Sequence, residues 1–259
     1  MSWRKINRIN TFILIVAVFL TSCSNGDSND FSKNFIEIIE TNENGISENT
    51  VFSYHENQII SSDNSKEKIE YTYNNGLITK VVKYNKETQL NTTLEYTYLK
   101  GKLVKAKSVN NYVIYYTHNA DATVTYERYK IGSENQELKV NHGTLFFNNR
   151  NLVKDERFFD NVSEGIVAGS KTSFEYDAYN NPYKSILGFD KLLDRGALVS
   201  KNNVVITIVE TTVENDDGTI TSANIYRTNF KYDSDDYPTE QLSEASVGNP
   251  NYSKIQYLY

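Results

Sequence analysis

Few residue types in this 259-residue chain could do chemistry. There is one cysteine, Cys23, and there are three histidines, His55, His118 and His142, which lie far apart in the sequence. Histidine metal sites need ligands that converge at a definable spacing, as in H-E-x-x-H, and no such spacing occurs here. The sequence also lacks the G-x-S-x-G pattern of a nucleophile elbow. We therefore expect no metal centre, no cofactor and no enzymatic activity.

Two acidic segments are candidates for calcium. Residues 214–218 (ENDDG) and 233–236 (DSDD) gather the hard oxygen ligands that Ca²⁺ prefers. Neither has the complete calcium-loop pattern with its closing bidentate glutamate. Tight turns require the same residue types, so the interpretation as turns is favoured. Among 33 acidic residues, no pair of carboxylates can be singled out as a glycosidase dyad.

Tyrosine is enriched, with 20 Tyr beside 12 Phe. An exposed tyrosine can stack on a sugar ring or a peptide, because its ring has an apolar face and a polar tip. Tyr71, Tyr73, Tyr96 and Tyr98 lie in two alternating segments and are our candidate ligand-binding residues. Packing of these rings in the core and across neighbouring strands is the favoured alternative.

The elements that position these tyrosines are predicted to be β-hairpins. In residues 69–73 (IEYTY), apolar and polar residues alternate with the period of a half-buried strand. The following Asn75-Gly76 pair accepts the positive φ angles of a type I′ turn. A register set by this turn pairs Tyr73 with Ile78, Tyr71 with Lys80 and Ile69 with Val82.

The same combination of an aromatic strand end, a short polar turn and a second strand recurs along the chain. No segment after Cys23 has the pattern of a long amphipathic helix. We therefore predict an all-β fold: a single antiparallel meander of repeated hairpins that forms a curled sheet or a partly open, barrel-like shell. The aromatic residues that begin the turns are Tyr54, Tyr73, Tyr98, Phe147, Tyr176 and Tyr232.

These turns resemble the YD repeat of Rhs-type proteins, whose core is Tyr-Asp, a short polar turn with Gly, and then Leu or Pro. Tyr176-Asp177 and Tyr232-Asp233 match best, and each is followed by a proline a few residues later. The resemblance covers residues 50–245, but elsewhere Asn, Leu or His replaces Asp. Rhs shells are far longer and enclose a toxic cargo, so the resemblance implies hairpin architecture and no particular function.

The N-terminus has the order of a bacterial export signal, with basic residues before an apolar run at 12–20. This run is too short to cross a hydrocarbon core, which needs roughly 20 helical residues. Residues 20–23 (LTSC) resemble the lipobox of bacterial lipoproteins, which implies cleavage before Cys23 and lipidation of its thiol. Two or more acyl chains would anchor the mature protein stably in a membrane.

The chain thus divides into a lipoprotein signal peptide (1–22), a flexible acidic tether (23–34) and a YD-repeat-like β domain (35–259). Ser24 follows the cysteine, which by resemblance to Gram-negative lipoproteins favours sorting to the outer membrane. The acidic tether resembles those that accompany surface display in some Gram-negative groups, which favours exposure on the cell surface and leaves the face of the membrane open. Loss of the three basic residues of the signal (Arg4, Lys5 and Arg8) would change the net charge from −6 to −9, which argues against nucleic acid as a partner.

The sequence predicts a non-enzymatic outer-membrane lipoprotein that has a binding or structural role toward a glycan or an envelope protein. A concave sheet lined by apolar side chains would favour the alternative of a carrier for lipid or another apolar ligand. A cleft that holds two close carboxylates would favour a glycan hydrolase, the weakest of the three interpretations.

Overall fold

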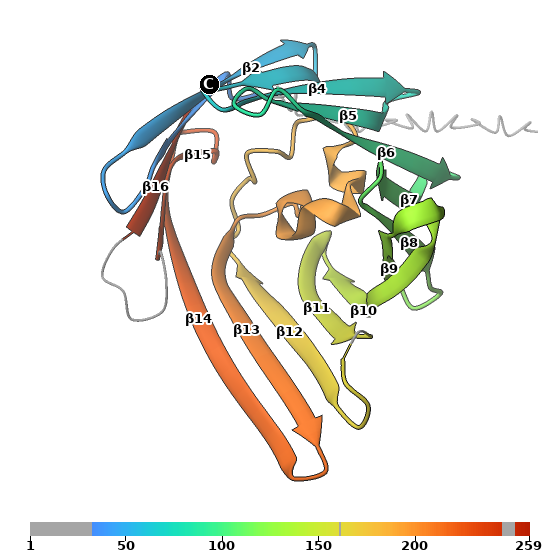
Figure 1. Ribbon diagram of the computed structural model, residues 1–259. Coiled ribbons are helices and arrows are strands. Elements are labelled where there is room, and N and C mark those ends of the chain that lie inside the picture. Colours follow the sequence, from blue (N-terminus) through green and yellow to red (C-terminus); the bar gives the residue numbers. More distant parts are fainter. Residues whose placement is uncertain (1–32, 161, 245–251) are drawn as a thin grey trace, which may run out of the picture. The chain divides into compact units, whose positions relative to one another are not determined.

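The computed structural model describes residues 33–160, 162–244 and 252–259. These residues form sixteen antiparallel strands that follow one another around a ring, and β1 pairs with β16 to close a barrel (Figure 1). The predicted all-β meander of hairpins is confirmed, and its shell closes fully. Within the described ranges, no helix is long and apolar enough to cross a membrane.

Short 3₁₀ helices accompany the strands: η1 (Ser133–Asn135), η2 (Phe189–Lys191) and η3 (Leu193–Val199). The strands are β1 (Glu37–Thr41), β2 (Ser47–His55), β3 (Gln58–Asp63), β4 (Glu67–Asn74), β5 (Leu77–Asn85), β6 (Asn91–Leu99), β7 (Lys102–Ser108), β8 (Tyr112–His118), β9 (Val124–Ile131), β10 (Glu137–Asn148), β11 (Asn151–Phe159), β12 (Val167–Tyr176), β13 (Val204–Asn215), β14 (Gly218–Tyr232), β15 (Pro238–Glu244) and β16 (Tyr252–Leu258).

The register of the β4–β5 hairpin differs from the prediction after its first pair. Tyr73 pairs with Ile78 as expected, but a β-bulge between Thr72 and Tyr73 shifts the remaining residues by one. Ile78 and Val81 of β5 are three positions apart, so on a regular strand they would point to opposite faces of the sheet. The bulge inserts one extra residue between them, and both side chains then point into the core, where they are buried. As a result Tyr71 faces Val81 instead of Lys80, and Ile69 faces Lys83 instead of Val82.

Every aromatic residue that we predicted to begin a turn has such a register shift directly before it, so the repeat in the sequence marks a repeated bulge. All these residues lie at the same end of the barrel, because alternate connections of a meander share an end. The bulges precede Tyr54, Tyr73, Tyr98, Phe147, Tyr176 and Tyr232.

The predicted turn after Tyr176 is wrong in one respect. The chain does not return at Pro182 but at Val204, where β13 begins. The intervening residues 177–203, which we call the plug, carry η2 and η3 and lie inside the ring of strands (orange in Figure 1). Backbone hydrogen bonds tie the plug to three turns: Leu187 N–H to Asn57 O at 2.9 Å, Lys201 N–H to Arg150 O at 3.2 Å and Asn180 N–H to Asp236 O at 3.0 Å.

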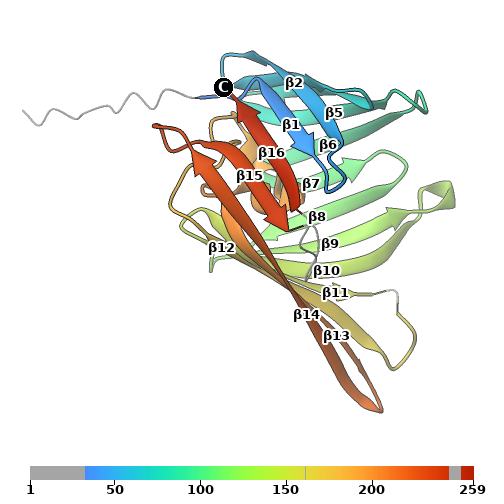
Figure 2. The same cartoon turned by 90° about the vertical axis from the view of Figure 1, so that its left-hand side faces the viewer.

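The inner face of the wall is mainly apolar around the plug, although Arg128, Asp155 and Arg157 also line a small interior pocket beside it. The outside of the protein carries charged side chains together with exposed apolar ones such as Phe158 and Val167. Inward side chains of the wall pack with plug residues such as Phe189 and Leu192 in one buried cluster. On the outside, ion pairs cross neighbouring strands, with Glu240 bound by both Lys231 (2.8 Å) and Lys254 (2.7 Å). The hydrophobic core of the protein is therefore the filled lumen of its barrel. Figure 2 shows the wall from the side, with the β13–β14 hairpin extending beyond the other strands.

Candidate functional site

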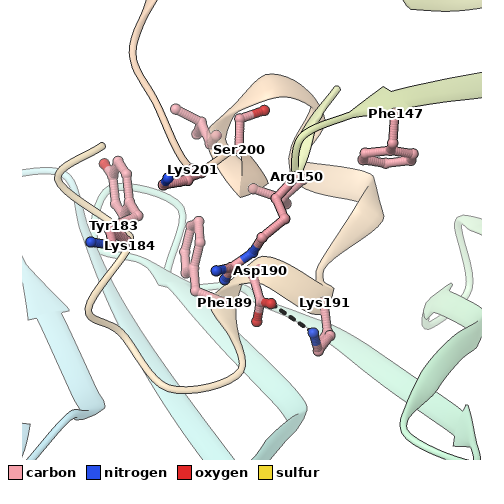
Figure 3. A pocket seen from close by; sticks show the side chains of 11 residues that line it. Phe147, Arg150, Tyr183, Lys184, Phe189, Asp190, Lys191, Ser200 and Lys201 are labelled. Carbon is pink, nitrogen blue, oxygen red and sulfur yellow. Dashed lines mark hydrogen bonds and ion pairs between the residues drawn. The ribbon is translucent and has the colours of Figure 1, made fainter. Parts of the chain in front are cut away.

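A pocket of about 170 Å³ opens at the plugged end, between the plug and the β10–β11 turn; we call it the mouth pocket. Its lining includes three aromatic residues, Phe147, Tyr183 and Phe189 (Figure 3). The rings of Tyr183 and Phe189 stack, with 4.7 Å between centroids and 15° between planes. Pockets that enclose a whole drug-sized ligand measure roughly 300–1,000 Å³, so this pocket suits one end group of a larger molecule.

The rim of the mouth pocket is basic. Arg150, Lys184, Lys191 and Lys201 line it, and Asp190 is the one acidic residue among its lining side chains. Lys191 Nζ pairs with Asp190 Oδ2 at 2.6 Å, the dashed contact in Figure 3. Within the part of the chain that the structure describes, Arg150 and Lys201 form no ion pair. Positive charge is thus concentrated at this rim in a chain whose net charge is −6.

Two buried asparagines fix the position of the rim. Asn151 Nδ2 donates to Asn202 Oδ1 at 3.1 Å, and the backbone N–H of Asn202 donates to Asn151 Oδ1 at 3.1 Å. Buried amides that satisfy each other hold their geometry, because a broken bond would leave a buried polar group without a partner. Arg150 precedes Asn151 and Lys201 precedes Asn202, so this asparagine clasp places both cations on the same rim.

Arg150 has a backbone conformation that L-residues seldom adopt. The β10–β11 turn has positive φ at both central residues, 49° at Asn149 and 67° at Arg150. In the β4–β5 and β6–β7 hairpins the second of these positions is a glycine, Gly76 (φ 73°) or Gly101 (φ 75°). The left-handed conformation costs a non-glycine residue roughly 1–2 kcal/mol. Other non-glycine turn residues, such as Lys100 (φ 51°) and Ala122 (φ 67°), share this conformation, so it distinguishes Arg150 only from the glycines of these two hairpins.

A second polar cluster lies inside the barrel, where η3 meets β6. Asp194 Oδ2 accepts a hydrogen bond from the Tyr96 hydroxyl at 3.0 Å and lies 4.0 Å from Arg195 Nε. The Asp194 side chain is only 7% exposed, and this burial raises the pKa of its carboxyl, which the charge of Arg195 opposes. Asp194 Oδ1 has no hydrogen-bond partner among the described residues. The cluster joins the plug to the wall.

The four tyrosines that we predicted to bind a ligand all point into the barrel and belong to its core or pack against it. Tyr96 bonds to the plug as described above. Burial raises the pKa of Tyr73 to about 12, and it raises the pKa of Tyr71 as well. Packing, the favoured alternative, is what the structure shows for these rings. The hydroxyls of Tyr73 and Tyr98 bond to the wall: Tyr73 accepts from Ile59 N–H at 3.1 Å, and Tyr98 donates to Ile78 O at 2.8 Å.

Both acidic segments form turns. Asp233 Oδ1 accepts the backbone N–H groups of Asp235 and Tyr237, at 2.9 and 3.0 Å, and Lys33 Nζ binds the carboxylates of Asp233 and Asp235. Residues 214–218 span the connection from β13 to β14. The three histidines lie on β2, β8 and β10. Across the described ranges, no group of three His, Cys, Asp or Glu side chains is placed to hold a metal ion.

Other predicted features fall outside the described residues. These are Cys23, the signal peptide and the tether up to residue 32, so lipidation stays a prediction. The end of the tether is described, and Lys33 lies at the plugged end of the barrel, where it binds Asp233.

Sequence reasoning missed the residues of the mouth pocket because most of them lie in the plug, which was interpreted as a short turn. Two signals could have pointed to them. Residues 183–203 do not have the period-2 pattern of a strand, and Asn149-Arg150 stands where the neighbouring hairpins have Asn-Gly or Lys-Gly.

No protein-family model matches the sequence, and no curated protein matches it. The fold is similar to that of a porin-like protein from Bacteroides vulgatus, with a TM-score of 0.56 and 15% sequence identity over 87% of this chain and 98% of that chain. It is also similar to a porin-like protein from Bacteroides uniformis, with a TM-score of 0.49 and 10% identity over 86% and 96% of the two chains. At 15% identity, the first likeness shows a shared barrel fold.

Proposed function

We propose that this protein is a non-enzymatic binding barrel of the bacterial outer membrane, held there by acyl chains on Cys23 while its wall stays in water. The observation that carries this proposal is the polarity of the wall. Transmembrane barrels alternate apolar-out and polar-in, and a Lys or Arg that faces lipid at the midplane costs about 2–4 kcal/mol.

The outer face of this barrel carries ion pairs on several neighbouring strands. Glu240 with its two lysines crosses β14, β15 and β16, and further ion pairs between Lys171 and Glu210 and between Lys139 and Glu127 cross other strand pairs. Burial of so many charges in lipid would be unfavourable. A lipid anchor would hold such a barrel at the outer membrane without inserting its wall.

The plug supports a binding role over a role as a channel. The structural relatives are described as porin-like, but in this chain the plug residues Phe189, Leu192 and Val199 are buried inside the barrel. The apolar inner face is the feature that would favour a lipid carrier. That face, however, packs against the plug, and the cavity between the plug and β12–β16 measures about 260 Å³, less than a typical ligand pocket.

The tether would keep the plugged end near the membrane. Lys33 lies at that end, ten residues after Cys23, and ten residues span at most about 36 Å when fully extended.

Replacing Cys23 with Ser in the full chain tests the anchor. In a Gram-negative host, we expect the unmodified protein to require detergent for release from the outer membrane and Cys23→Ser to be released folded without detergent, while Ser28→Ala, a nearby tether substitution, behaves as the unmodified protein does. A Cys23→Ser barrel that still requires detergent would show that the wall itself is inserted. A glycan array probed with the released barrel tests the binding role, and silence across all sugars would contradict it.

A further inference from the structure

We propose that the mouth pocket binds a phosphate monoester, carried either by a sugar or by a lipid headgroup. The assignment goes beyond the proposed function, since the pocket exists whether or not the chain is acylated.

Charge is the first argument. Lys191 is paired with Asp190, whereas Arg150 and Lys201 have no acidic partner in the described part of the chain. A phosphate monoester carries a charge of about −1.5 to −2 near neutral pH, which two cations balance. The planar fork of an arginine can also donate two parallel hydrogen bonds to phosphate oxygens.

Rigidity is the second argument. The asparagine clasp fixes the backbone of Arg150 and Lys201, and the backbone N–H of Lys201 also donates to Arg150 O at 3.2 Å. A rim that is already in place avoids part of the ordering cost of binding.

The floor of the pocket is the third argument, because it indicates what carries the phosphate. Phe147, Phe189 and Leu198 line the pocket together with the basic residues, and Phe189, which is buried, forms its floor. An aromatic and aliphatic floor suits the apolar face of a sugar ring or the glycerol end of a lipid headgroup. Figure 3 shows the Arg150 guanidinium group directed toward Phe189 and Asp190.

Isothermal titration calorimetry of the mature protein with glucose 6-phosphate and with glucose tests the proposal. We expect glucose 6-phosphate to bind and glucose not to bind, because hydrogen bonds to charged groups contribute most of the affinity. Arg150→Gln and Lys201→Gln should each weaken binding roughly tenfold or more, which corresponds to about 1.4 kcal/mol. Lys231→Gln, which removes an equal charge from the outer wall, should leave binding within about twofold.

A lipid arm distinguishes the two sources of the phosphate. In this experiment the Cys23→Ser protein is floated with vesicles that contain phosphatidic acid. Flotation that is lost when Arg150→Gln is added to the Cys23→Ser protein would identify a lipid headgroup. Binding of glucose 6-phosphate that depends on Arg150, without such flotation, would identify a sugar phosphate.

The proposal is overturned if neither glucose 6-phosphate nor phosphatidic acid binds, if glucose binds as tightly as its phosphate, or if Lys231→Gln weakens binding as much as Arg150→Gln. Because Arg150 and Lys201 are exposed at the rim, both variants should fold, and circular dichroism checks this. The glucose 6-phosphate titration does not depend on the Cys23→Ser release experiment, so failure of one proposal is distinguishable from failure of the other.

Discussion

The β4–β5 hairpin and the β12–β13 pair begin in the same way and end differently. In each, an inward tyrosine follows a bulge and pairs across to an apolar residue, Tyr73 to Ile78 and Tyr176 to Val204. The first pair closes through the two residues Asn75-Gly76, whereas the second closes through the whole plug, residues 177–203.

This difference separates what builds the wall from what fills it. A barrel of about eight strands is narrow enough for wall side chains to fill its interior, and wider barrels leave space. With sixteen strands, this barrel needs additional residues to make a dry core. Between β12 and β13 the plug stands in place of a short turn and supplies these residues. The plug also forms most of the mouth pocket.

The largest expected effect comes from removing an apolar side chain of the plug. Leu192 is fully buried in the core cluster, so Leu192→Ala should lower the free energy of unfolding by about 2–5 kcal/mol. Leu99, which is 63% exposed on the wall, provides the matched control, and Leu99→Ala should have an effect within about 0.5 kcal/mol. Urea unfolding followed by circular dichroism measures both.

The shape of the unfolding curve sharpens the same comparison. If the plug is part of the core of the barrel, Leu192→Ala should shift one cooperative transition as a whole. A separate early transition, with the main one unchanged, would show instead that the plug is an independent unit and that the wall is stable without it.

The wall was predictable from the sequence and the plug was not, for a physical reason. Period-2 alternation and turn residues such as Asn75-Gly76 are local, so they indicate hairpins directly. The bulge beside Tyr73 depends on which residues of the opposite strand must face the core, and the β1–β16 closure joins the two ends of the described barrel. Neither is encoded by neighbours in the sequence.

The candidate site shows the same limit more sharply. Asn151 and Asn202 are 51 residues apart in the chain, and each alone has the composition of an ordinary turn. The tyrosines were candidates for ligand binding because they are numerous, yet Tyr96 is buried in the core and Tyr71 packs against it. The residues at the pocket rim are common types that become a site only when the plug returns to the β10–β11 turn.

A medium effect is expected from Asp194, a buried carboxyl that the plug has and the tight hairpin turns lack. Burial raises the pKa of Asp194 in the folded protein, so the folded state binds this proton more tightly than the unfolded state does. Stability from this group is therefore fully present below the unfolded pKa and falls as pH rises through the folded pKa, by at most about 1.4 kcal/mol per pH unit. Asp194→Asn, which cannot titrate, should flatten the stability curve across this window.

Thermal unfolding from acidic to neutral pH measures the Asp194 effect. Asp216→Asn, in the exposed β13–β14 turn, should keep the pH dependence of the unmodified protein. An Asp194→Asn curve parallel to that of the unmodified protein would show that other groups cause the pH dependence and that the contact between plug and wall is insensitive to the charge of Asp194.

The smallest effects concern two turns with the same backbone and different residues. Gly76→Ala should destabilise the protein by about 1 kcal/mol, because φ is 73° there and the added Cβ meets Leu187 only at an ordinary distance of 3.6 Å. Arg150→Gly should stabilise the β10–β11 turn by a similar amount, about 1 kcal/mol, because glycine adopts positive φ without strain.

Chemical denaturation measures both changes in the free energy of unfolding, and calorimetry with glucose 6-phosphate measures the loss of binding affinity in Arg150→Gly. A variant that gains stability and loses binding would show that the arginine is kept for the ligand at the expense of the fold, whereas one that loses stability would show that Arg150 is needed by the turn itself.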